Sequence, residues 1–164
     1  MNTLLEHAAE ILILLFLIIT FMQSGIDKVM DWTGNLSWLR SHFSETPLQG
    51  LVPVLLAIVL IAEMLAGILC AVGLVQLLLY ESGKIALLGA IVSCVSLLML
   101  LFGQRLAKDY DGAKTIAVYF IPAVFLVFLY VDGIRRLQQL LFRYYTMHQS
   151  QRQGLVGRHA APGE

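Results

Sequence analysis

An acidic residue, Glu63, lies within a long apolar stretch of the sequence. The apolar stretch before it ends in a cluster of polar residues. A carboxylate near the centre of a bilayer costs roughly 2.5 to 3.5 kcal/mol, so it usually faces a helix interface or a wet cavity and marks a candidate functional site. The chemistry open to it is the binding of a polar head group or coupling to a proton. Its candidate partners in the preceding stretch are Gln23, Ser24, Asp27 and Lys28.

The depth of each residue in the membrane ranks these partners. Glu63 follows Leu51 by twelve positions, which is about 18 Å along a helix. If the first span leaves the membrane near Met30, Gln23 lies about 10 Å deep and Lys28 about 3 Å deep. We therefore expect Gln23 to be the nearest partner and Lys28 a second one that bends its chain inward. These four polar residues and Glu63 are predicted to line one pocket that opens toward the first and third loops.

The alternative interpretation of these residues is structural. Glu63 would be a protonated or hydrogen-bonded packing residue, while Asp27 and Lys28 would mark the membrane edge. His42 and Glu45, in the loop that follows, have no spacing typical of a metal site, so we expect them to be solvated and expect no metal.

Composition predicts the elements that position these residues. Of the 164 residues, 59% are hydrophobic and 13% charged, and the mean hydropathy is +0.79, whereas soluble domains have about 25% charged residues. The sequence predicts an all-α membrane protein in which residues 1–133 form a four-helix transmembrane bundle. The predicted spans are 8–30, 51–79, 84–102 and 113–131. A short interfacial helix is expected in the first loop, beginning near Asn35 or Ser37.

The C-terminal part alternates apolar and basic positions at helical spacing. Residues 134–148 are therefore predicted to form an amphipathic juxtamembrane helix, and residues 149–164 a disordered tail. Four spans place both termini on one side, and the arginines directly after the last span indicate that this side is the cytoplasm.

Small residues at four-residue spacing predict close helix packing. In the second span Ala62 and Ala66 follow this spacing, with Gly67 beside them, and Gly25 and Gly89 lie in the first and third spans. The short turn 81–83 predicts that the second and third spans form an antiparallel hairpin.

Several function classes are disfavoured by the same sequence. Lys and Arg number 11 against 11 Asp and Glu, so the basic field that nucleic-acid binding requires is missing. Cys70 and Cys94 form neither a CxxC pair nor a zinc motif and are expected to pack. Because the chain has no haem-ligand pair or nucleotide-binding motif, we predict no catalytic residue and no autonomous enzyme.

Three short motifs carry a family resemblance. The first span ends in SGxxK from Ser24 to Lys28, the second holds Glu63 followed by Met, Leu, Ala and Gly, and a DGA motif begins at Asp111. Over residues 1–133 the chain resembles the DoxX family of small four-span bacterial membrane proteins, in particular its Bacteroidetes-like branch. Gly25, Lys28 and Glu63 match the family pattern. The basic residue near the start of the family's first span is replaced here by acidic residues.

The resemblance implies a protein of the bacterial inner membrane. The family is named after a subunit associated with thiosulfate:quinone oxidoreductase, and some members are linked to membrane thiol or oxidative-stress systems. The first hypothesis is accordingly an accessory subunit of a quinone- or thiol-linked redox complex, with a non-covalently held quinone or lipid as candidate ligand.

Two other hypotheses remain open. The chain would be a carrier for a small solute or lipid that uses Glu63 as a proton-coupled site, and a homodimer would then be expected. Alternatively it would be a purely structural subunit whose polar cluster fixes helix register. The expected partners are the lipid bilayer and either other membrane subunits or further copies of the chain.

Overall fold

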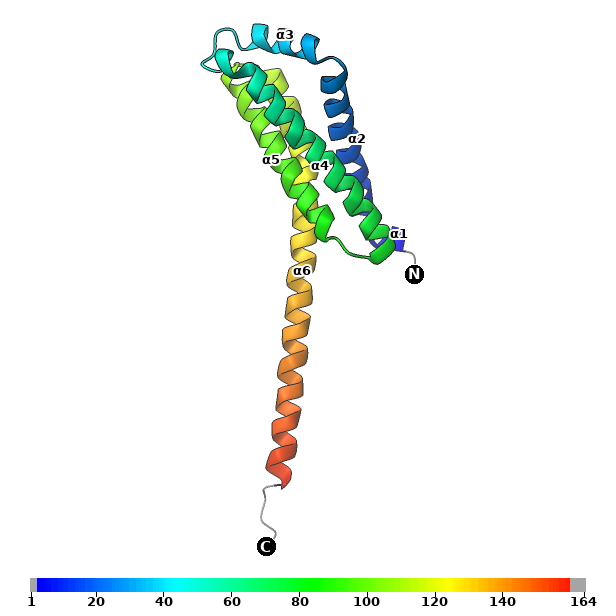
Figure 1. Cartoon of the computed structure of the whole chain (residues 1–164). Coiled ribbons are helices and arrows are strands. Elements are labelled where there is room, and N and C mark those ends of the chain that lie inside the picture. Colours follow the sequence, from blue (N-terminus) through cyan, green and yellow to red (C-terminus); the bar gives the residue numbers. More distant parts are fainter. Residues whose placement is uncertain (1–2, 160–164) are drawn as a thin grey trace. The chain divides into compact units, whose positions relative to one another are not determined.

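The structure is a computed structural model that describes the backbone of residues 3–159 and the side chains of residues 5–136 and 138–143. The described chain is helical (Figure 1), in the order α1 (Thr3–Glu6), α2 (Ala8–Met30), α3 (Trp32–His42), the 3-10 helix η1 (Gln49–Leu51), α4 (Val52–Tyr80), α5 (Lys84–Leu106) and α6 (Tyr110–His159). It divides into two compact units, Met1–Phe128 and Leu129–Glu164.

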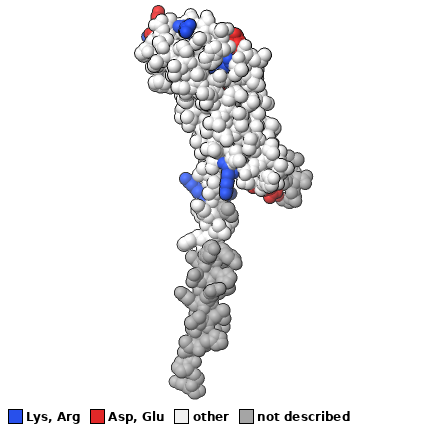
Figure 2. Space-filling view, in the orientation of Figure 1, with Lys and Arg blue, Asp and Glu red and all other residues white. Residues whose placement is uncertain are grey.

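Four stretches of the described chain are long and apolar enough to cross a membrane: Ala8–Met30, Gln49–Tyr80, Lys84–Leu106 and Tyr110–Arg143. Large apolar side chains on each of them are exposed, among them Leu12, Ile61, Phe102 and Phe128. On the face of the first unit seen in Figure 2, charged side chains lie near the end that α3 covers and near the opposite end, and the sides of the helices between them show none. Exposed apolar surfaces of this kind are stable in contact with the lipid bilayer. The chain is a multi-pass integral membrane protein, and the predicted all-α four-span fold is confirmed.

The α4 and α5 helices form an antiparallel hairpin with their backbones in direct contact. The turn uses Glu81, which adopts a left-handed conformation with φ of 52°. A Cβ atom added at Gly73 would lie 2.5 Å from the Cα of Ala86, and one added at Gly89 would lie 2.9 Å from the backbone nitrogen of Cys70. Only glycine permits so close an approach at these two positions.

Two glycines also bring α2 against α4. Gly25 is packed by the side chain of Met64, and a Cβ at Gly67 would lie 2.8 Å from the Sδ atom of Met22. These contacts fix an antiparallel register in which the end of α2 is level with Val59. The α4 helix therefore begins about 10 Å beyond the end of α2, so the end of α2 and the start of α4 do not lie at the same level.

The remaining small residues of α4 differ in burial. Ala66 and Cys70 have no exposed surface, whereas Ala62 is partly exposed. The Sγ atom of Cys70 lies 3.6 Å from the hydroxyl of Ser93, a residue of α5. This contact is a packing contact of the kind expected between closely spaced helices.

The short helix predicted in the first loop is present as α3, which crosses from the end of α2 toward the start of α4 (Figure 1). Its predicted start near Asn35 or Ser37 is wrong, because the helix begins at Trp32. Asp31 caps it by accepting a 3.0 Å hydrogen bond from the backbone N–H of Gly34, and aspartate is among the best N-cap residues.

The predicted division of the C-terminal part also differs from the structure. The α6 helix continues without a break through the predicted separate helix 134–148, and residues 149–159, predicted to be disordered, are helical. An Asp132–Arg136 ion pair of 2.8 Å spans Gly133 and offsets part of the helix cost of that glycine. The rest of the predicted tail, 160–164, lies outside the described residues.

Candidate functional site

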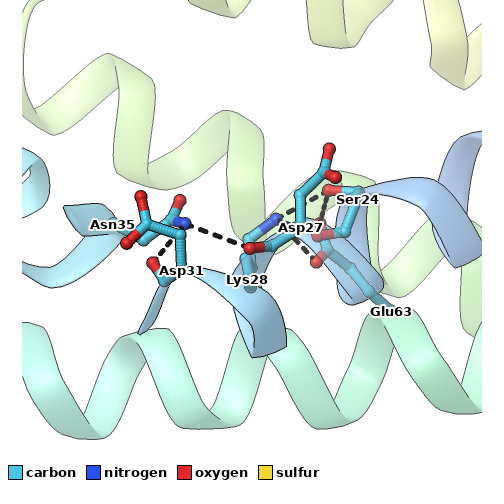
Figure 3. A network of polar contacts seen from close by, with 6 residues as sticks. All are labelled: Ser24, Asp27, Lys28, Asp31, Asn35 and Glu63. Atoms are coloured by element: carbon cyan, nitrogen blue, oxygen red, sulfur yellow. Dashed lines mark hydrogen bonds and ion pairs between the residues drawn. The ribbon is translucent and has the colours of Figure 1, made fainter. Parts of the chain in front are cut away.

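Glu63 is buried in α4, with 1% of its surface exposed, and its carboxylate meets two side chains of α2 (Figure 3). The hydroxyl of Ser24 donates a 3.1 Å hydrogen bond to Oε1. The Nζ atom of Lys28 lies 2.9 Å from Oε2 and also donates a 2.6 Å hydrogen bond to the Ser24 hydroxyl. Because Oε2 accepts no aligned hydrogen bond from the described residues, the charge of Lys28 is what compensates it.

The local sequence explains why these groups meet. Ser24 and Lys28 are four positions apart, so they share one face of α2. Helical side chains point back toward the N-terminus, which turns the Lys28 chain toward Ser24, whose carbonyl oxygen also accepts a 3.3 Å hydrogen bond from Nζ. Gly25, on the buried side of α2, lets α4 come close enough for Glu63 to reach both residues.

The predicted order of partners is therefore wrong. Gln23 was expected to be nearest to Glu63, yet it is exposed and forms no hydrogen bond with Glu63 among the described contacts. Gln23 would lie nearest if the end of α2 and the start of α4 were at the same level, whereas α4 begins beyond the end of α2. The offset and the direction of the lysine side chain together bring Lys28 to the carboxylate.

Asp27 lies beside the pair without joining it. Its carboxylate is exposed and points away from Lys28 and Glu63 (Figure 3). Its backbone carbonyl oxygen accepts hydrogen bonds from the backbone N–H of Asp31, at 3.0 Å, and from the side chain of Asn35, at 3.5 Å. Asp27 thus ties the end of α2 to the start of α3 through its backbone and leaves its side chain free for a neighbouring cavity.

That cavity has a volume of about 410 Å³, and polar side chains make up about half of its lining, the rest being apolar residues such as Phe21 and Leu100. We call it the polar cavity. Four of the five predicted residues line it, namely Gln23, Ser24, Asp27 and Glu63, and Tyr119 of α6 lines it as well. Lys28 is not among its lining residues. The predicted single pocket therefore contains all of the predicted residues except the lysine.

Lys28 instead lines a second cavity of about 240 Å³ between α3, α4 and α5. Among the described residues, the other polar one in its lining is Gln104, near the end of α5. The remaining lining residues are apolar or glycine: Leu39, Phe43, Leu48, Val52, Leu55, Leu56, Val59, Met99, Leu100, Phe102 and Gly103. The Lys28–Glu63 pair thus joins the edge of an apolar cavity to the edge of a polar one.

Sequence reasoning missed the role of His42. The Nε2 atom of His42 donates a 3.1 Å hydrogen bond to the Oε1 atom of Gln104 and lies 3.8 Å from a carboxylate oxygen of Asp109. Its ring stacks on Trp38, with centroids 4.6 Å apart. His42 therefore fastens the end of α3 over the apolar cavity. Because 62 positions separate His42 from Gln104, no local pattern could have indicated this contact.

The described side chains contain no group of three or more His, Cys, Asp or Glu that could hold a metal ion. Comparison with protein-family models, curated proteins and solved structures finds no match for this chain. The evidence for function is therefore the site itself and the short motifs that contain it.

Proposed function

We propose that this chain is a DoxX-like accessory subunit of a membrane redox assembly, and that it receives a quinone in the apolar cavity between α3, α4 and α5. The observation that carries the proposal is the composition of that cavity, which is apolar apart from Lys28 and Gln104. An apolar pocket with a few polar groups is typical of small-molecule sites. The SGxxK and Glu63 motifs, which resemble those of the DoxX family, support the same proposal.

The polar groups of the cavity suit a ligand with two carbonyl oxygens. The Gln104 side-chain oxygen is engaged by His42, so its amide N–H groups are the donors that remain for a ligand. Lys28 supplies an ammonium group at a separate point of the wall. A bound quinone would supply two-electron redox chemistry, while the chain would bind and orient it. Because the sequence has no CxxC pair or nucleotide-binding motif, the electrons are assigned to a partner subunit.

A binding experiment tests the ligand. The purified protein in lipid nanodiscs is titrated with a decyl-substituted benzoquinone, and binding is followed by quenching of tryptophan fluorescence. Val59→Phe fills the apolar cavity and is expected to weaken binding about tenfold or more. Ile58→Phe is the matched control, because Ile58 directly precedes Val59 on α4 and is 46% exposed on the outer face. Equal affinity in the two variants would contradict the proposed site.

A second experiment tests the assembly. The protein is solubilised gently from its native membranes, and the subunits that co-migrate with it are identified. A dehydrogenase or oxidase subunit is expected, with the assembly intact but quinone turnover lost in Glu63→Gln and Lys28→Ala. Normal turnover in both variants would leave a purely structural role for the chain.

The polar cavity favours a second candidate function, a carrier for a small polar solute. Glu63, Gln23 and Asp27 line this cavity, and a carboxylate in such a place is typical of proton-coupled sites. Uptake of solute by liposomes containing only this protein, lost in Glu63→Gln, would favour the carrier over the redox subunit.

For the location we propose the bacterial inner membrane with both termini in the cytoplasm. The support is Arg135, Arg136 and Arg143, which are exposed and follow the predicted span 113–131, in agreement with the positive-inside rule.

A further inference from the structure

The Lys28–Glu63 pair separates two cavities of opposite character. Glu63 and Ser24 line the polar cavity, whereas Lys28 lines the apolar one. Glu63 is 1% exposed and Lys28 16% exposed. Each cavity therefore reaches one member of a buried ion pair whose two charged groups are in contact.

We propose that Glu63, Ser24 and Lys28 form a proton relay that carries protons from the polar cavity to a ligand oxygen in the apolar cavity. The inference rests on the proposed function, because it requires a proton-accepting ligand beside Lys28. It adds to that function a source for the protons and a direction in which they move.

Every step of the relay lies within hydrogen-bond reach. The Oε2 and Nζ atoms are 2.9 Å apart without the alignment of a hydrogen bond. The proton therefore passes from Glu63 to Lys28 through the Ser24 hydroxyl, which lies 3.1 Å from Oε1 and 2.6 Å from Nζ. A hydroxyl both donates and accepts a hydrogen bond, so it passes on one proton as it receives another. Heavy-atom separations of about 2.6 to 3.2 Å are those required for proton transfer between side chains.

The steps balance in protons. Lys28 loses an N–H proton to the ligand oxygen and becomes a neutral amine, which leaves Glu63 as a buried and uncompensated carboxylate. Glu63 then binds a proton from the polar cavity and transfers it to Lys28, which restores the ion pair. One proton enters and one leaves in each cycle, and two cycles supply the two protons that accompany two electrons from the partner subunit.

Burial gives the relay its direction. A lone carboxylate with 1% exposure is costly until it is neutralised, so loss of a proton by Lys28 drives uptake by Glu63. The polar cavity supplies the route for that uptake, since Gln23 and Asp27 line it beside Glu63. The apolar lining of the other cavity disfavours water, and with it a competing supply of protons, on the ligand side.

The test uses the full-length protein in nanodiscs, loaded with the decyl-substituted benzoquinone on an electrode that supplies the electrons. A potential step reduces the bound quinone, a pH-sensitive dye follows proton uptake, and rapid-scan infrared spectroscopy follows the carboxylic acid C=O band. In the wild-type protein a transient carboxylic acid band is expected while Glu63 holds its proton. Glu63→Gln should abolish the band and slow proton uptake about 100-fold or more, the usual contribution of a positioned acid–base group.

Two further variants complete the experiment. Glu45→Gln removes an exposed loop carboxylate and should leave both signals unchanged. If Glu63→Gln does not bind the quinone, Glu63→Asp is measured instead; its shorter chain lengthens the gap to Lys28 and should slow uptake. Quinone binding with wild-type uptake in the Glu63 variant would overturn the relay alone. Failure of the wild-type protein to bind the quinone would overturn the proposed function, and the relay with it.

Discussion

The buried ion pair makes an asymmetric prediction about stability. Lys28→Met removes the ammonium and leaves Glu63, which is 1% exposed, with the Ser24 hydroxyl as its hydrogen-bond partner among the described residues. Glu63→Gln leaves an ammonium that is 16% exposed, lies near the end of α2, and has a long chain that can turn toward the surface. We therefore expect the lysine substitution to be the more damaging of the two.

The magnitudes follow from burial. Removing one partner of a buried ion pair costs about 3 to 5 kcal/mol, and Lys28→Met should lie at the lower end, near 3 kcal/mol, because the isolated carboxylate can neutralise itself by taking up a proton. Glu63→Gln should cost about 1 kcal/mol, as for a lost hydrogen bond. The double variant has no uncompensated charge and should lose about 2 kcal/mol rather than the sum of about 4, which is a coupling of about 2 kcal/mol.

The free energies of unfolding can be measured by reversible unfolding of the protein with SDS in mixed micelles, followed by far-UV circular dichroism. Losses that add to within about 0.5 kcal/mol would show that the two residues do not interact. A larger loss for Glu63→Gln than for Lys28→Met would refute the argument from unequal burial.

Three further predictions concern the elements around the pair. Gly73→Ala should destabilise the protein by at least about 2 kcal/mol in the same assay, because the added methyl group meets the backbone of α5. Gly67→Ala should cost less than about 1 kcal/mol, because its methyl group meets the flexible side chain of a methionine. Equal losses of stability in the two variants would contradict this packing. His42→Ala should loosen α3 and speed backbone hydrogen exchange in this helix about tenfold or more, and unchanged exchange would show that the histidine does not fasten it. A cysteine at the exposed Ser37 should react with a membrane-impermeant thiol reagent in intact cells, and labelling only after permeabilisation would reverse the proposed orientation.

The spans were predictable because the membrane imposes the same requirement on every residue of a span. About 20 consecutive apolar residues are needed to cross the hydrocarbon core. This requirement does not depend on how the helices pack against one another. The α2 helix accordingly covers Ala8–Met30, and α5 begins at Lys84. The start of α3 was missed because a single side-chain cap at Asp31 decides it.

The continuation of α6 was missed for a related reason. A Gly after an Asp usually suggests a helix end, but Asp132 pairs with Arg136 across Gly133. The pair is worth only a few tenths of a kcal/mol, and such small terms decide where a helix ends when the flanking residues are good helix formers. Local patterns therefore predict the existence of a helix better than they predict its limits.

The site was predictable in its members but not in its connections. A lone carboxylate in an apolar span requires a partner. The polar end of the preceding span holds the nearest polar side chains in the sequence, and Ser24 and Lys28 are therefore among the candidates. Which of them reaches Glu63 depends on the offset between α2 and α4, and that offset is set by Gly25 and Gly67, which contact methionines of the opposing helix.

The same offset explains why one predicted pocket is two cavities. Because α4 begins beyond the end of α2, its first turns have no α2 beside them, and α3 with the start of the next loop covers them instead, which creates the apolar cavity. Lys28, two residues from the end of α2, lies where this cover begins, whereas Ser24 lies one turn deeper, beside the polar cavity. A helix register that is set by two glycines thus determines that an ion pair stands between an apolar and a polar space, and the proposed movement of protons depends on that position.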